Sequence, residues 1–134
     1  MRQLLLKKLR ERLTKLDELF HKYVKALSNL YPYSTIILFG SRARGECLPY
    51  SDYDIMIIIK DINDKIERVV NAYKIKPPEL AVDLVLISEK ELEDPIIEKM
   101  LREGCKIIYD GLGITYRLLR ICNKNEHVNN QQLE

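Results

Sequence analysis

The sequence predicts an α+β domain in which a mixed sheet of about four strands packs with helices and follows one long N-terminal helix. Residues 2–30 contain neither proline nor glycine. Beyond them, short apolar and β-branched runs alternate with amphipathic stretches, and glycine or proline separates most of these. The chain has 134 residues, 46% hydrophobic and 31% charged, which is typical of one soluble globular domain spanning 1–134.

Residues 1–30 are expected to form the long amphipathic helix. Its apolar positions alternate steps of three and four, a heptad pattern, at 6, 9, 13, 16, 20, 23, 27 and 30. At 1.5 Å per residue the helix would be about 43 Å long, more than a domain of this size needs to cover its core. Two interpretations stay open: a helix that packs on the core along its length, or one that docks a second subunit or a partner protein with part of its seam.

The other elements follow in chain order. Strands are expected in the short, apolar and β-branched runs at 35–39, 53–60, 81–87 and 105–109. Helices are expected from 61 or 63 to about 73, over 94–104, and from 111 onward to 121. The core of the domain would then span 34–109. Residues 123–134 are polar and rich in asparagine and glutamine, and are expected to form a flexible tail.

Composition argues against several classes of function. The 22 basic and 20 acidic residues leave a net charge of +2, so we expect no general affinity for nucleic acids or membranes. The longest apolar run, 55–59, is far shorter than the roughly 20 residues of a membrane span. Three widely spaced cysteines, Cys47, Cys105 and Cys122, predict neither a disulfide framework nor a zinc site. We therefore expect a reducing compartment, the cytoplasm.

A phosphate-binding turn is predicted at Gly40-Ser41, where an expected strand ends. Glycine permits close approach of the backbone, and exposed N–H groups after a strand can bind an anion such as a triphosphate. Arg42 and Arg44 follow on the same short element, where their charge could offset that of phosphate groups.

Three aspartates predict a metal site. Asp52 and Asp54 are two residues apart at the start of a strand, so both side chains project from one face. Unpaired carboxylates there would repel each other, and Mg²⁺ shared with phosphates would remove that cost. Asp83 lies inside another apolar run. If the two strands are neighbours, the three carboxylates converge as a two-metal displacement at phosphorus requires, and each becomes a catalytic residue and a metal ligand.

The string G-S-R-A-R-G, followed by S-D-x-D, resembles the signature of the DNA polymerase β-like nucleotidyltransferase superfamily, and in particular its minimal nucleotidyltransferase branch. The resemblance covers about residues 34–109 and implies the polymerase β-like fold. In that family the Gly-Ser pair binds the nucleoside triphosphate, the paired aspartates bind Mg²⁺, and a third strand aspartate completes the metal site. The resemblance assigns nucleotide binding to Gly40, Ser41, Arg42 and Ser51, and metal binding and catalysis to Asp52, Asp54 and Asp83.

The resemblance also implies an activity and a partner. Minimal members pair with a helical HEPN-type ribonuclease toxin and act as its antitoxin by transferring AMP from ATP to a tyrosine of the toxin. A hydroxyl attacks the α-phosphate and pyrophosphate leaves. Asp83 would help one metal ion lower the pKa of the hydroxyl, while Asp52 and Asp54 would hold a second ion against the triphosphate.

Other functions stay open at this point. The chain could be a non-catalytic nucleotide-binding module that neutralises a partner by contact, or a transferase that acts on a small molecule or on RNA. Near-neutral charge and the lack of a second domain to grip RNA favour a protein acceptor. A homo-oligomer formed through the N-terminal helix is a further possibility.

Overall fold

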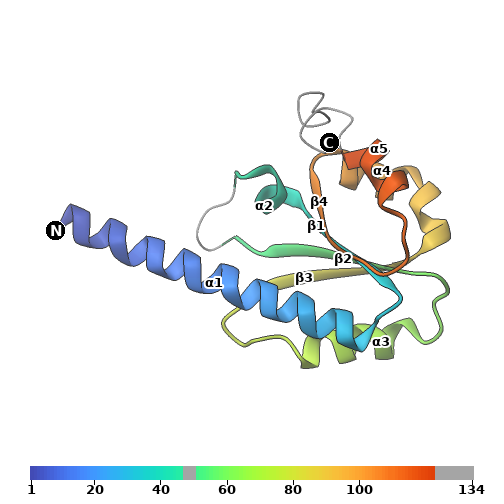
Figure 1. Cartoon of the computed structure of the whole chain (residues 1–134), viewed down its shortest axis with the longest axis horizontal. Coiled ribbons are helices and arrows are strands. Elements are labelled where there is room, and N and C mark those ends of the chain that lie inside the picture. Colours follow the sequence, from blue (N-terminus) through green and yellow to red (C-terminus); the bar gives the residue numbers. More distant parts are fainter. Residues whose placement is uncertain (47–50, 123–134) are drawn as a thin grey trace.

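The computed structural model describes residues 1–46 and 51–122, and its centre is a four-stranded sheet in the order β3-β2-β1-β4 (Figure 1). The strands are β1 Ser34–Phe39, β2 Tyr53–Ile59, β3 Val82–Ser88 and β4 Cys105–Asp110. β1 pairs antiparallel with β2 and β4, whereas β2 pairs parallel with β3. The mixed α+β sheet is therefore confirmed, with each strand within a residue or so of its predicted position.

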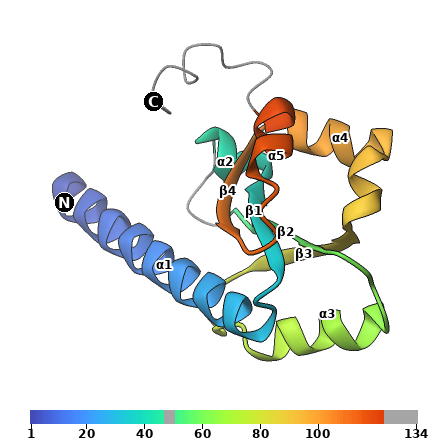
Figure 2. The same cartoon turned by 45° about the vertical axis from the view of Figure 1, so that its right-hand side comes forward.

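Helices cover both faces of this sheet (Figure 2). They are α1 Arg2–Leu30, α2 Gly40–Arg44, α3 Lys65–Lys74, α4 Pro95–Arg102 and α5 Thr115–Cys122, with a 3₁₀ turn at Glu89–Glu93. α1 and α3 contribute to the apolar layer on one face, and α4 and α5 to the layer on the other. None of the helices within the described residues is long and apolar enough to cross a membrane.

The central strands fill both apolar layers because their side chains alternate between faces. Ile55 and Ile57 of β2 pack in the layer that α1 covers, and Met56 and Ile58 pack in the opposite layer. A strand covered on both sides has no solvent face, which explains the unbroken apolar run noted in the sequence.

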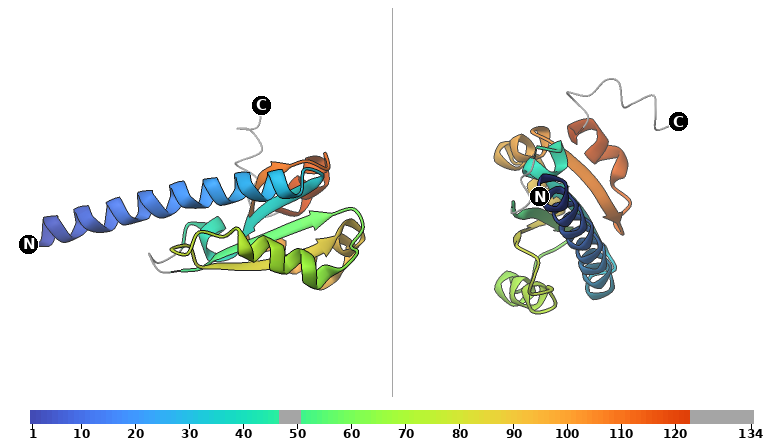
Figure 3. Two further views of the ribbon diagram at one scale, coloured as in Figure 1. Left: turned by 90° about the horizontal axis from the view of Figure 1, so that it is seen from below. Right: turned by 90° about the vertical axis from the view of Figure 1, so that its left-hand side faces the viewer.

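α1 is longer than the sheet that it covers. Its buried side chains, Phe20, Tyr23, Val24 and Leu27, all lie in the second half of the helix. The first half projects beyond the rest of the protein (Figures 1 and 3). The predicted core-packing role therefore holds for the second half, while the described chain leaves the first half uncovered.

Asp110 holds the start of α5 against β1. Its carboxylate accepts hydrogen bonds from the Thr35 hydroxyl (2.7 Å) and from the backbone N–H groups of Gly113, Ile114 and Thr115 (2.9, 3.1 and 2.9 Å). The Thr115 hydroxyl adds another at 2.5 Å. Burial alone would raise the pKa of Asp110, but these hydrogen bonds outweigh burial and lower it to about 2.

The sequence predicts no disulfide framework, but the structure joins two of the three cysteines. A disulfide joins Cys105, at the start of β4, to Cys122, at the end of α5, with Cα atoms 5.2 Å apart. Spacing along the chain did not reveal this pair, because only the packing of α5 against β4 brings the two residues together. The cysteines therefore no longer support the expected reducing compartment. Cys47 and the predicted tail at 123–134 lie outside the described residues.

Candidate active site

Gly40 and Asp54 are in contact at the end of the sheet where β1 stops and β2 begins. Asp54 pairs across the sheet with Phe39, the residue before Gly40. A Cβ atom added to Gly40 would overlap Oδ2 of Asp54, so a side chain at this position would displace the carboxylate. Gly40 also has a φ of 74°, which glycine adopts without strain. Both the backbone conformation and the neighbouring carboxylate therefore require glycine here.

Asp54 is directly opposite Asp83 in the parallel pairing of β2 with β3. Residues in register on neighbouring strands point to the same face, so the two carboxylates lie on one side of the sheet. The side chain of Asp54 is half-buried, whereas those of Asp52 and Asp83 are exposed. Burial raises the pKa of Asp54, the charges of Asp83 and Asp52 raise it further, and Arg44 opposes them. The acids therefore form a centre of negative charge that Arg44 offsets only in part.

The chemistry of this centre fits Mg²⁺. Carboxylate oxygens are the protein ligands that Mg²⁺ prefers, and the ion is usually held by one or two carboxylates, with water and substrate phosphates completing its coordination. Within residues 1–46 and 51–122, no group of three or more acidic, histidine or cysteine side chains is gathered closely enough to hold a metal by itself. Asp54 and Asp83, in register on neighbouring strands, have the donor chemistry to hold such an ion together with nucleotide oxygens.

Arg42 lies on the other side of β2. Its Nε and Nη2 atoms donate hydrogen bonds to the carbonyl oxygen of Ser51 (2.9 and 2.8 Å), and its guanidinium group stacks 3.9 Å from the centre of the Tyr53 ring. Tyr53 in turn stacks on Phe20 of α1, with ring centroids 4.7 Å apart. These contacts hold the start of β2 against α1. The nucleotide-binding roles predicted for Arg42 and Ser51 remain predictions beside this positioning role.

Arg44 is the arginine of this turn whose charge acts on Asp54, where it lowers the pKa. Its Nε atom also contacts a carboxylate oxygen of Glu46 at 3.2 Å. Residues two apart on a helix project about 200° from each other, so Arg42 and Arg44 cannot face the same side of α2. The sequence named both arginines but did not show which one faces the acids.

A groove of about 340 Å³ borders the same end of the sheet. It is lined by Leu13, Thr14 and Asp17 of α1 together with Arg42 and Tyr53. The sequence motif gave no reason to connect α1 with the site, because the two are separated by β1 in the chain. In the structure, α1 forms one wall of a groove that Tyr53, at the start of β2, also lines.

A glycine turn that admits phosphate groups, set beside carboxylates that can hold a metal ion, suits the transfer of phosphorus-containing groups from nucleotides. The family described as "Nucleotidyltransferase domain" matches residues 21–108, and the chain belongs to this family. It is a nucleotidyltransferase. A candidate protein adenylyltransferase of Methanocaldococcus jannaschii is 32% identical over 96 residues, which cover 68% of this chain and 92% of that protein.

Solved structures share the fold. A candidate nucleotidyltransferase from Sulfolobus solfataricus matches with a TM-score of 0.56 and 21% identity, over 76% of this chain and 86% of that one. A chain from a toxin–antitoxin crystal structure determined with AMP-PNP matches with a TM-score of 0.51 and 18% identity, over 84% of this chain and 92% of that one. The likeness agrees with the nucleotidyltransferase fold expected from the signature.

Proposed function

We propose that the chain transfers AMP from ATP to a hydroxyl group of a partner protein, and that it does so as the antitoxin of a HEPN-type helical toxin. The observation that carries the catalytic part is the contact of the Asp54 carboxylate with Gly40, in register with Asp83, in a chain of the nucleotidyltransferase family. The name of the archaeal relative supports a protein acceptor. The AMP-PNP complex supports ATP and a toxin partner.

The residues divide the work by position. Gly40 and Ser41 would bind the triphosphate through their backbone, and Arg44 would offset its charge from the side of Asp54. Asp52, Asp54 and Asp83 would hold Mg²⁺, which when bound neutralises phosphate charge and lowers the pKa of an attacking hydroxyl. Asp83 lies on β3 at the edge of the sheet and is exposed, so an arriving acceptor could reach its carboxylate.

The reaction forms one bond and breaks one. The acceptor oxygen bonds to the α-phosphorus as the bond from that phosphorus to the β-phosphate oxygen breaks, so pyrophosphate leaves and the hydroxyl proton is lost. We assign residues 1–134 to one nucleotidyltransferase domain with its catalytic core at 34–109. We place the reaction in the cytoplasm, where ATP is available.

The experiment that tests this function uses ATP labelled at the α-phosphate, Mg²⁺ and lysate of the host. Asp54→Asn is the inactive variant, and Asp61→Asn, an exposed aspartate after the other end of β2, is the matched control. The proposal expects label on a protein band with the wild type and with Asp61→Asn, and none with Asp54→Asn. Asp54-dependent label on RNA or on a small molecule would show that the acceptor is that molecule and not a protein. Neutralisation of the partner by Asp54→Asn, without label, would establish a module that acts by contact.

A further inference from the structure

Four leucines form an exposed strip on the projecting half of α1. Leu5, Leu6, Leu9 and Leu13 retain 61, 49, 36 and 37% of their surface in contact with solvent. At 100° per residue they lie on the same side of the helix as the buried Phe20, so this leucine strip continues the core-facing side of α1 beyond the sheet. The family match begins at residue 21, which leaves the strip outside the shared domain.

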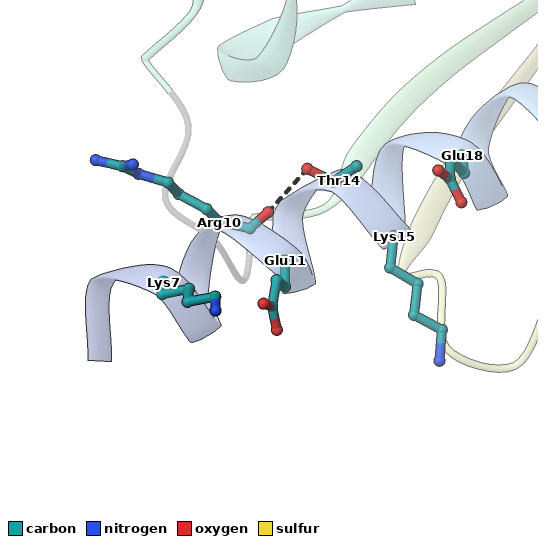
Figure 4. A pocket seen from close by; sticks show the side chains of 6 residues that line it. All are labelled: Lys7, Arg10, Glu11, Thr14, Lys15 and Glu18. Atoms are coloured by element: carbon teal, nitrogen blue, oxygen red, sulfur yellow. Dashed lines mark hydrogen bonds between the residues drawn. The ribbon is translucent and has the colours of Figure 1, made fainter. Parts of the chain in front are cut away.

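The edges of the leucine strip are basic. Residues 2–15 contain one acidic residue, Glu11, against six basic residues, a net charge of +5; the basic residues are Arg2, Lys7, Lys8, Arg10, Arg12 and Lys15. Helical spacing sets Arg10 along one edge of the strip and Arg12 and Lys8 along the other. Lys7, Glu11 and Lys15 project from a different side of α1 than Arg10 does (Figure 4). A complementary surface would be apolar with acidic edges.

The charge and the shape of the leucine strip decide which of three binding partners fits it: a second copy of the chain, a membrane or a single helix. Two copies of the chain, placed strip against strip, would bring two segments of charge +5 together, which charge repulsion opposes. A flat membrane would meet the body of the protein, because Leu13 of the strip also lines the groove with Arg42 and Tyr53. A single helix is narrow enough to follow the strip into that groove, and the heptad spacing of Leu6, Leu9 and Leu13 suits helix-to-helix packing.

We propose that the leucine strip docks an amphipathic helix with acidic edges on the protein that carries the acceptor hydroxyl. The identity of that protein as the acceptor rests on the proposed function, whereas the docking surface rests on α1 and the groove that it borders. A helix bound along the strip reaches the groove that Tyr53 lines, at the end of the sheet that carries Asp54 but on the opposite face of the sheet. The strip therefore selects the acceptor and brings it to the end of the sheet where AMP is transferred.

Binding is measured on the full chain with a fluorescent synthetic peptide of about three heptads, with leucine at the two core positions and glutamate on both flanks. Its acidic flanks keep it from pairing with itself. The proposal expects binding that the double variant Leu6→Gln/Leu9→Gln weakens by about tenfold or more. Leu4→Gln, an exposed leucine on another side of α1, should leave it unchanged. A peptide with lysine in place of glutamate should not bind. Circular dichroism checks that the variants keep their helix.

Equal binding of the two peptides would overturn the docking surface. So would binding that Leu6→Gln/Leu9→Gln does not change, or a dimer in sedimentation that this variant converts to a monomer. Flotation with vesicles of phosphatidylglycerol and phosphatidylcholine that depends on the same leucines would overturn it in favour of a membrane.

With the labelled acceptor, the double variant should raise KM about tenfold and leave kcat within about twofold. Peptide binding without any Asp54-dependent label would overturn the proposed function alone, and label with an unchanged KM would overturn the docking surface alone.

Discussion

The carboxylate of Asp54 occupies the space that a side chain on Gly40 would need. Asp54 lies on β2 and Gly40 begins α2 directly after β1, and the two meet because Asp54 pairs with Phe39, one residue before the glycine. A side chain at position 40 would therefore displace the carboxylate of Asp54. Substitutions of Gly40 and of Asp54 should have different effects on the stability and the activity of the protein.

Gly40→Ala should abolish nucleotidyl transfer by displacing Asp54, with a loss of at least about 100-fold. It should also lower the free energy of unfolding by about 2 kcal/mol, because alanine is strained at positive φ and overlaps the carboxylate. Gly113→Ala is the matched control, since Gly113 has the same φ of 74° and open space around it. It should cost about 1 kcal/mol and keep the activity. Urea unfolding and transfer of labelled AMP measure both effects, and equal activity losses in the two variants would contradict this explanation.

Asp54→Asn should separate activity from stability. Transfer of AMP should be lost, because the amide cannot supply the charge that a metal ion needs. Without metal, the variant should melt about 2 °C higher than the wild type, because the repulsion from Asp83 and Asp52 that raises the pKa of Asp54 is removed. Thermal unfolding in EDTA measures this shift. A lower melting temperature would show that Asp54 stabilises the metal-free fold instead.

Substitutions of the two arginines of α2 should affect different properties, one the stability of the fold and the other the binding of nucleotide. Arg42→Gln should lower the free energy of unfolding by about 1–2 kcal/mol, since it loses the bonds to Ser51 and the stacking on Tyr53. Arg44→Gln should leave stability nearly unchanged and weaken the stabilisation that ATP with Mg²⁺ gives. Thermal unfolding with and without nucleotide distinguishes them. If Arg42→Gln weakened the stabilisation by nucleotide and Arg44→Gln lowered the stability of the fold, Arg42 would be the arginine that binds phosphate.

Asp110 should govern the acid limit of stability. Its pKa of about 2 lies below its ordinary value of 3.8, so the unfolded chain binds more protons than the folded one between these values. The stability that ionised Asp110 contributes is therefore present above about pH 4 and disappears as the pH falls toward 2. Asp110→Asn should lower the free energy of unfolding by about 2 kcal/mol at pH 7 and flatten its decline in acid. Urea unfolding across this range measures the slope, with the exposed Glu79→Gln as control. An equally steep decline in Asp110→Asn would assign the effect to other carboxylates.

Local patterns predicted the elements well where one physical cause decides them. The apolar runs of β1 and β2 indicated strands because both faces of the sheet are covered, and the heptad pattern indicated α1 because nothing interrupts it. The start of α3 was less accurate, since its N-cap is Asp64 at a φ of 56° and not the predicted Asp61 or Asn63. Asp64 takes a left-handed conformation there, which spacing in the sequence does not reveal.

The site was predictable as a set of residues and not as an arrangement. Asp54 pairs with Asp83 because β2 and β3 are parallel neighbours. The sequence could not show that these two strands are adjacent, so it predicted the pairing only if they were. Packing between distant segments decides which of the two arginines, Arg42 or Arg44, acts on Asp54, and it places Leu13 beside Tyr53. Sequence patterns report local preferences and therefore say little about such contacts.

The disulfide between β4 and α5 has a consequence for how the fold opens. Cys105 pairs across the sheet with Phe39, so one end of the covalent link lies beside the strand that leads into Gly40. Because α5 cannot leave the sheet without carrying Cys105, the helix and the strand form one cooperative unit in local opening. Amide protons of both should exchange with solvent together, because the disulfide prevents the small fluctuations in which an untethered α5 would separate from the sheet.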